Sequence, residues 1–206
     1  MTDKTHQTKS QFVAVASIAA ELSAVMEVAK EISLAAANAK AIAFRAGEKA
    51  RGFQPITDFI NELAKETITL VNAINEHALL LYRLTVNEYR TSTAFDKFQA
   101  ATKMAEGAQY QSSLQTSTEA VEQRMLECRK QFRRHVGQLL DQLQEVMHPA
   151  RAARVIAANS RIEASQAGEY LLSLQAVAES VDRAAQIIHN NVQRCRSALN
   201  VININE

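Results

Sequence analysis

Apolar residues near the start of the chain recur every seven positions in two interleaved registers. One register holds Val15, Leu22, Ala29, Ala36 and Ala43, and the other holds Ile18, Val25, Ile32, Ala39 and Ala46. All ten positions are apolar, which is typical of a long helix that packs as in a coiled coil. Gly47, Gly52 and Pro55 then interrupt the pattern, as expected for a reversal followed by a new helix. We therefore predict a helix over about 11–46.

Three further helices are predicted in the same way. The second seam contains Ile56, Ile60, Leu63, Leu70, Ile74, Leu81, Leu84, Phe95, Phe98 and Ala105, with polar interruptions at Thr67, His77, Glu88, Thr91 and Thr102. The third contains Leu114, Val121, Met125, Phe132, Leu139, Leu143 and Val146, and the last contains Leu171, Leu174, Ala178, Val181, Ala185, Ile188, Val192, Cys195 and Leu199. These seams predict helices over about 54–105, 112–167 and 170–200, with a connecting turn near 106–111.

Composition supports an all-α chain. The 206 residues include only 5 Gly and 2 Pro, too few turn residues for a β-rich fold of this size. The formal net charge of +1 argues against a dedicated nucleic-acid-binding domain. Residues 1–10 are polar, so we expect a disordered N-terminus followed by a single helical domain over 11–206. The longest uninterrupted apolar run, from Phe12 to Ala20, is too short to span a bilayer, and we expect a cytoplasmic protein without membrane insertion.

The sequence also matches itself without a gap when it is shifted by 121 residues. Ala36-Ala37-Asn38 falls on Ala157-Ala158-Asn159, and Ala46-Gly47-Glu48 falls on Ala167-Gly168-Glu169. A fixed internal period usually reflects duplicated supersecondary units. We predict two tandem helical hairpins, the first over 11–106 and the second over 112–200.

The repeated unit resembles the signalling tip of bacterial methyl-accepting chemotaxis receptors. The first copy contains Asn38, Arg45-Ala-Gly-Glu48, Arg51-Gly-Phe53, Asp58 and Leu63-Ala64 in the family's register, and the second keeps Asn159, Glu163 and Ala167-Gly-Glu169. The resemblance covers about 40 residues of each copy. It implies a non-enzymatic protein without a cofactor that docks on the chemotaxis histidine kinase, its coupling protein or full receptors. The implied partner-binding residues are Asn38, Arg45, Glu48, Arg51, Phe53, Asn159, Glu163 and Glu169.

The chain departs from the family at positions that mediate contacts between receptors. Where the family has a Glu four residues after the Asn, the first copy has Ile42, and where it has an Arg seven residues after the Asn, the second copy has Gln166. Where the family has a Val that helps dock the coupling protein, the first copy has Pro55 and the second has Ala176. These changes put standard receptor trimers and standard coupling in doubt.

Matched helix lengths predict how the hairpins stack. If the chain reverses near 47–53 and again near 168–171, the two outer helices and the two inner helices have similar lengths. They then form a long antiparallel four-helix bundle with both tips at one end, like a receptor dimer fused into one chain. The alternative is a turn at His148-Pro149 followed by one helix through Gly168, because proline is unfavourable in the interior of a helix. Its unequal helices would leave apolar seams exposed, so we favour a kink at Pro149 and a reversal near Gly168.

Catalytic motifs are sparse in this sequence. Glu145 and His148 have the Glu-x-x-His spacing of di-metal bundles, but such sites need a second motif and two more Glu residues. We therefore expect neither a metal site nor an enzyme, and a di-metal carboxylate enzyme stays a weak alternative. A purely structural bundle without a role in chemotaxis is the other alternative.

Overall fold

The computed structural model describes residues 2–107, 109 and 111–204, and the side chains of residues 10–107, 109 and 112–202. Its helices are α1 (Thr2–Ala46), α2 (Phe53–Met104), α3 (Gln111–Ala164) and α4 (Leu171–Ile204). Short 3₁₀ turns, Gly47–Ala50 and Gly168–Tyr170, follow α1 and precede α4. No strand occurs among the described residues.

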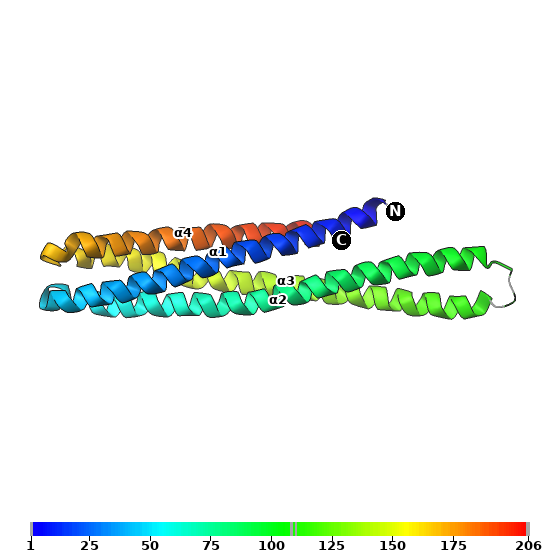
Figure 1. The fold of residues 1–206 in the computed structure, drawn as a ribbon, viewed down its shortest axis with the longest axis horizontal. Coiled ribbons are helices and arrows are strands. Elements are labelled where there is room, and N and C mark those ends of the chain that lie inside the picture. The colour runs from blue at the N-terminus through cyan, green and yellow to red at the C-terminus, as the bar shows by residue number, and fades with distance from the viewer. Residues whose placement is uncertain (1, 108, 110, 205–206) are drawn as a thin grey trace.

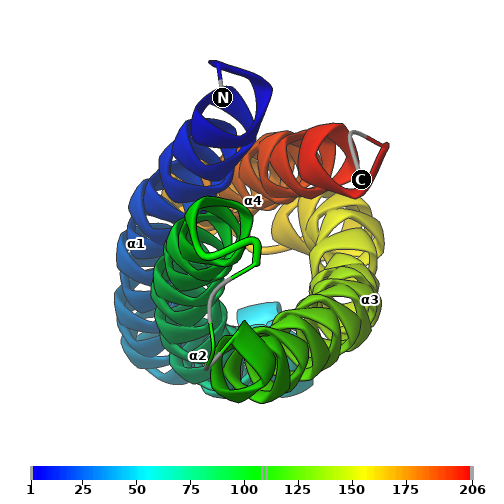
Figure 2. The same cartoon turned by 90° about the vertical axis from the view of Figure 1, so that its right-hand side faces the viewer.

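The four helices form one long antiparallel bundle. α1 packs against α2 and α4, and α3 packs against the same two helices. Figure 1 shows the α1–α2 and α3–α4 reversals at the same end of the molecule. Seen along the bundle, the helices surround a common axis (Figure 2). The predicted all-α four-helix bundle with both tips at one end is therefore confirmed.

α2 and α3 extend beyond the other two helices. They continue past the N-terminal end of α1 and the C-terminal end of α4 as a two-helix arm that ends at their connection (Figure 1). Thr102 Oγ1 and Thr118 Oγ1, 3.2 Å apart, link the two helices in this arm. Several of its apolar side chains, including Phe95, Phe98 and Val121, are only half-buried.

Both reversals at the tips depend on a glycine with a positive φ. Gly47 has φ +56° and Gly168 has φ +58°, in the left-handed region that residues with a Cβ rarely adopt. The chain thus turns back near Gly168, as expected, and α3 runs through Pro149 without a break. The alternative with a turn at His148-Pro149 is wrong.

The core follows the predicted seams closely in α1 and α4. All ten predicted seam residues of α1 are buried. In α4, eight of the nine predicted residues are buried and Leu171 is half-buried. The bundle is therefore held by burial of apolar area along continuous heptad seams.

The predicted register of α2 is partly wrong. Leu63, Leu70 and Leu84 are only half-buried beside the seam. Thr67 is buried in the seam, where it was predicted as a polar interruption, and Thr85 is buried there although it was not predicted. The hydroxyls of these threonines donate to carbonyls four residues earlier, on Leu63 and Leu81, at 2.8 and 3.0 Å. A helix can bury threonine in this way because its own backbone satisfies the hydroxyl.

Glu88 is a charged residue in the α2 seam. Its Oε1 accepts a bond of 3.2 Å from Arg129 Nε on α3. Its Oε2 is buried and has no hydrogen-bond partner among the described residues. The pairing with Arg129 partly offsets the cost of placing a carboxylate between helices.

α1 begins earlier in the sequence than expected, and it is also apolar enough to count as a candidate membrane-spanning segment. The helix begins at Thr2 rather than near residue 11. By length and composition alone, Ser10–Ala50 could cross a membrane, with about a third of its most apolar window buried. The uninterrupted apolar run ends at Ala20, but the many alanines that follow keep the segment apolar. In the structure this segment packs against α2 and α4.

Candidate interaction surface at the tips

A small second core holds the two tips together. We call it the tip core; its buried residues are Ala39, Ala43, Ala46, Ala50, Phe53, Ala164, Ala167 and Leu174. Its alanines leave room for the helices to approach closely. Phe53 and Leu174, the largest members, are fully buried and lie 121 positions apart in the sequence. Phe53 is therefore not accessible to a partner in this structure, although it was among the predicted binding residues.

The other predicted residues of the first tip are on the surface. Asn38 and Arg45 are exposed, and neither makes a hydrogen bond or ion pair with the part of the chain that the structure describes. Glu48 Oε2 and Arg51 Nη1 lie 3.4 Å apart in an exposed pair within the turn. Such an exposed pair contributes little to stability. The polar side chains of this tip are thus available for binding rather than needed for folding.

The predicted residues of the second tip make different contacts from those of the first. Asn159 is exposed, and Glu169 Oε1 lies 3.9 Å from Lys49 Nζ of the first tip. Glu163 is half-buried, and its carboxylate approaches Gly52 so closely that a Cβ there would collide with Glu163 Oε2. Glu163 therefore lies between the two hairpins at the start of α2, where a helix dipole favours a negative charge.

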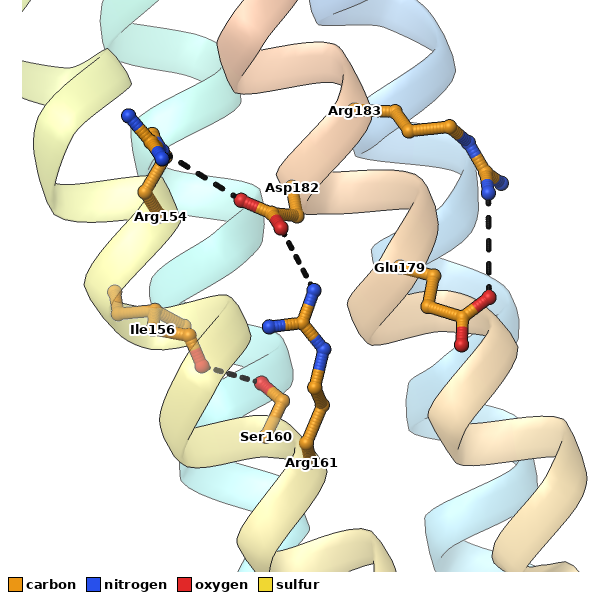
Figure 3. Close-up of polar contacts among 7 residues, drawn as sticks. All are labelled: Arg154, Ile156, Ser160, Arg161, Glu179, Asp182 and Arg183. Atoms are coloured by element: carbon orange, nitrogen blue, oxygen red, sulfur yellow. Dashed lines mark hydrogen bonds and ion pairs between the residues drawn. The ribbon is translucent and has the colours of Figure 1, made fainter.

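Ion pairs tie the two helices of each hairpin together near its tip. In the first hairpin, Lys40 Nζ lies 2.6 Å from Asp58 Oδ1. In the second, Asp182 of α4 accepts from Arg161 Nη2 at 2.7 Å and lies 3.6 Å from Arg154 Nε (Figure 3). Glu179 instead faces Arg183 on its own helix, at 4.0 Å (Figure 3). Asp182 thus bridges two turns of α3.

Apolar residues at this end were not predicted as binding residues. Phe44, Phe59, Ile162 and Leu172 are 79%, 58%, 62% and 76% exposed. Phe59 borders a hollow of about 280 Å³ that is also lined by Pro55, Ile56, Ile156 and Asn159. The sequence signal that could have identified these residues is that large apolar side chains occur at positions outside the heptad seams. Exposed aromatic groups beside polar ones are typical of protein-binding surfaces.

Among the residues that the structure describes, no comparable site for metal or thiol chemistry is found. No group of three or more His, Cys, Asp or Glu residues suited to a metal lies within the described part of the chain. Glu145 and His148 are both exposed on α3. Cys195 is buried, and this burial, with Glu21 nearby, raises the pKa of its thiol to about 12. A thiol with so high a pKa is a poor nucleophile.

A histidine pair lies between α2 and α3, away from the tips. His77 Nε2 and His135 Nδ1 are 3.0 Å apart, and His77 Nδ1 lies 2.8 Å from Gln142 Oε1. Burial lowers the pKa of His135, and the neighbouring His77 and Arg134 lower it further. His77 was predicted as a polar interruption of the α2 seam; in the structure both histidines are half-buried and form a polar link between α2 and α3.

In comparisons with known proteins, no family model, no curated protein and no solved structure matches this chain.

Proposed function

We propose that this chain is a signalling protein that resembles the tip of a chemotaxis receptor and docks, through its tips, on a chemotaxis histidine kinase, its coupling protein or a receptor. The protein would act by binding rather than by catalysis, in the cytoplasm, without a cofactor. The observation that carries the proposal is the exposure of the residues that match the family's interaction segment. Asn38, Arg45, Glu48 and Arg51 are all exposed, and Asn38 and Arg45 have no intramolecular polar partner among the described residues.

The matching geometry of the two turns supports the proposal. Gly47 and Gly168, 121 residues apart, share the same left-handed backbone conformation. Ala43 and Ala46 of the first tip share the tip core with Ala164 and Ala167, their counterparts in the repeat. A single chain that builds two equivalent hairpins side by side has the arrangement expected of a fused receptor dimer.

The departures from the family change which contacts the tip can make. Ile42 is half-buried and packs on the tip core where the family has a Glu. Glu163, which the second copy retains, lies against Gly52 of the other hairpin. Neither position then offers the exposed carboxylate that would pair with another receptor. We therefore expect docking to rely on Arg45, Glu48 and the apolar surface around Phe59.

The test is a double substitution at the exposed tip, Arg45→Ala with Glu48→Ala. Because both side chains are exposed, their removal should change the stability of the bundle by less than about 0.5 kcal/mol. Co-purification with the kinase and the coupling protein should fall at least about tenfold, the effect of losing roughly 1.4 kcal/mol of binding free energy.

The matched control is Lys65→Ala with Glu66→Ala, an exposed basic and acidic pair on α2 outside the tip. This variant should bind like the wild type. Equal binding by the tip variant would move the interface elsewhere. No binding by the wild-type chain to kinase, coupling protein or receptor would favour a purely structural bundle.

A further inference from the structure

The outer face of α2 carries an unusually ordered stripe of charges. Positions opposite the buried seam recur every seven residues, and all of them are exposed. We call this set the outer stripe; it comprises Glu62, Thr69, Glu76, Arg83, Arg90 and Lys97. Its acidic residues lie in the half nearer the tip, and its basic residues lie in the half nearer the arm. Within the described part of the chain, none of the five charged side chains makes an ion pair or a hydrogen bond.

We propose that a second copy of this chain docks along the outer stripe, antiparallel to the first. A two-fold axis between Leu79 and Leu80 would pair Glu62 with Lys97 and Glu76 with Arg83, each pair occurring twice. The same axis places Thr69 opposite Arg90. In a symmetric interface, residue i of one copy meets residue j of the other and the reverse also holds. A stripe whose charge changes sign at its centre is therefore complementary to the same stripe on an antiparallel second copy.

The charges also select the orientation. In a parallel pair, each stripe residue would face its own counterpart, so Glu would meet Glu and Arg would meet Arg. Like charges directly opposed disfavour binding, whereas complementary charges fix the register of an interface. Only the antiparallel pairing makes every charged contact of the stripe attractive or neutral.

Apolar side chains gather at the centre of the stripe. Leu79, Leu80 and Tyr82 are 63%, 38% and 48% exposed. Beside them, α1 and α2 form an almost wholly apolar groove of about 590 Å³, bordered by Phe12, Ala16, Ala19, Leu79 and Tyr82. The ring of Phe12 packs edge-on against Tyr82, with centroids 5.6 Å apart. The arrangement of an apolar centre between charged ends is typical of protein interfaces.

The dimensions suit a second copy as well. The proposed axis lies within one residue of the midpoint of α2, so the two bundles would overlap along their whole length. A strip about 78 Å long and one helix, about 10 Å, wide covers about 800 Å² on each copy. This is the area per partner of a specific protein interface of standard size. The proposal does not depend on the proposed function, because the outer stripe lies along the bundle and excludes the tip residues.

The first test is charge reversal followed by charge exchange, read by sedimentation equilibrium. Glu76→Arg would place two arginines opposite each other at two symmetric points, so we expect the dissociation constant of the dimer to rise at least about tenfold. Adding Arg83→Glu to the same chain restores opposite charges with their places exchanged, and dimerisation should return. Glu145→Arg, the same charge change at an exposed position of α3, is the matched control and should leave the dimer intact.

The second test identifies the orientation by zero-length carbodiimide cross-linking, which joins a carboxylate to an amine in direct contact. Glu62 and Lys97 are 35 residues apart on one helix, about 52 Å. A Glu62–Lys97 cross-link can therefore form only between two copies, and we expect it in the wild-type dimer. The proposal is overturned by a chain that stays monomeric at about 100 µM, well above a micromolar dissociation constant. It is equally overturned by a dimer that Glu76→Arg does not weaken, or by a dimer without this cross-link.

Discussion

At the scale of single residues, replacing a glycine of this chain should raise or lower stability depending on the backbone conformation at that glycine. Gly47 and Gly168 adopt a positive φ at the two tips, whereas Gly137 lies in the interior of α3. A Cβ added at Gly47 or Gly137 would meet no atom within 4 Å, so crowding does not separate these two sites. The backbone conformation alone decides the effect of a substitution there.

We expect Gly47→Ala to destabilise the bundle by about 1 kcal/mol, because an L-residue is strained in the left-handed region. Gly137→Ala should stabilise it by about 0.5–1 kcal/mol, because alanine is the better helix former. Urea unfolding followed by circular dichroism measures both. Two changes of the same sign would show that the first turn does not have the backbone conformation described.

The histidine pair makes a second residue-scale prediction. The folded chain lowers the pKa of His135 below its usual 6.5, with burial as the largest cause. The unfolded chain therefore binds this proton more readily. The contribution of this pKa difference to stability is fully present above pH 6.5 and is lost as the pH falls through the lowered pKa of the folded chain.

We thus expect the melting temperature to fall between pH 7.5 and pH 5, and His135→Gln to make that fall smaller. His148→Gln, at an exposed position of the same helix, is the control and should leave the pH dependence unchanged. An equally steep fall in the His135 variant would assign the effect to other groups.

At the scale of helices, α1 could be predicted almost completely and α2 could not. The predicted heptad seam of α1, from Val15 to Ala46, consists only of apolar residues, so hydrophobicity and burial coincide there. In α2, Thr67 and Glu88 lie in the seam as predicted, but the leucines that were assigned to the same seam flank it, so the most apolar positions are not the buried ones. The hydrogen bonds that make buried threonine acceptable lie within the helix and are invisible to a hydropathy pattern.

This correction predicts that two leucines of α2 differ in importance. Leu81 is fully buried in the core, whereas Leu63 is half-buried at its edge. Leu81→Ala should cost about 2–5 kcal/mol because it opens a cavity that the bundle cannot fully close. Leu63→Ala should cost clearly less, under about 2 kcal/mol. Chemical denaturation compares the two variants, and equal losses would mean that the observed register of α2 is wrong.

At the scale of the whole molecule, the sequence could predict that both tips lie at one end but not which contacts the two hairpins make with each other there. Equal helix lengths already predict both tips at one end, and the structure confirms that arrangement. The contact of Glu163 with Gly52 and the hollow beside Phe59 depend on how two hairpins pack sideways. No spacing within either repeat encodes that packing, so these features emerge only from the assembled bundle.

The proposed dimer leads to a last prediction, about molecular shape. α3 has 54 residues, so a single bundle is about 81 Å long. Two copies overlapping antiparallel along α2 double the mass but leave the longest dimension near that value, with the tips at opposite ends. Copies joined end to end through their tips would instead span about 160 Å. Small-angle X-ray scattering on the wild type should therefore show a thicker particle of nearly unchanged length. The Glu76→Arg variant should show the same length at half the mass, and a wild-type particle near 160 Å would place the contact between copies at the tips.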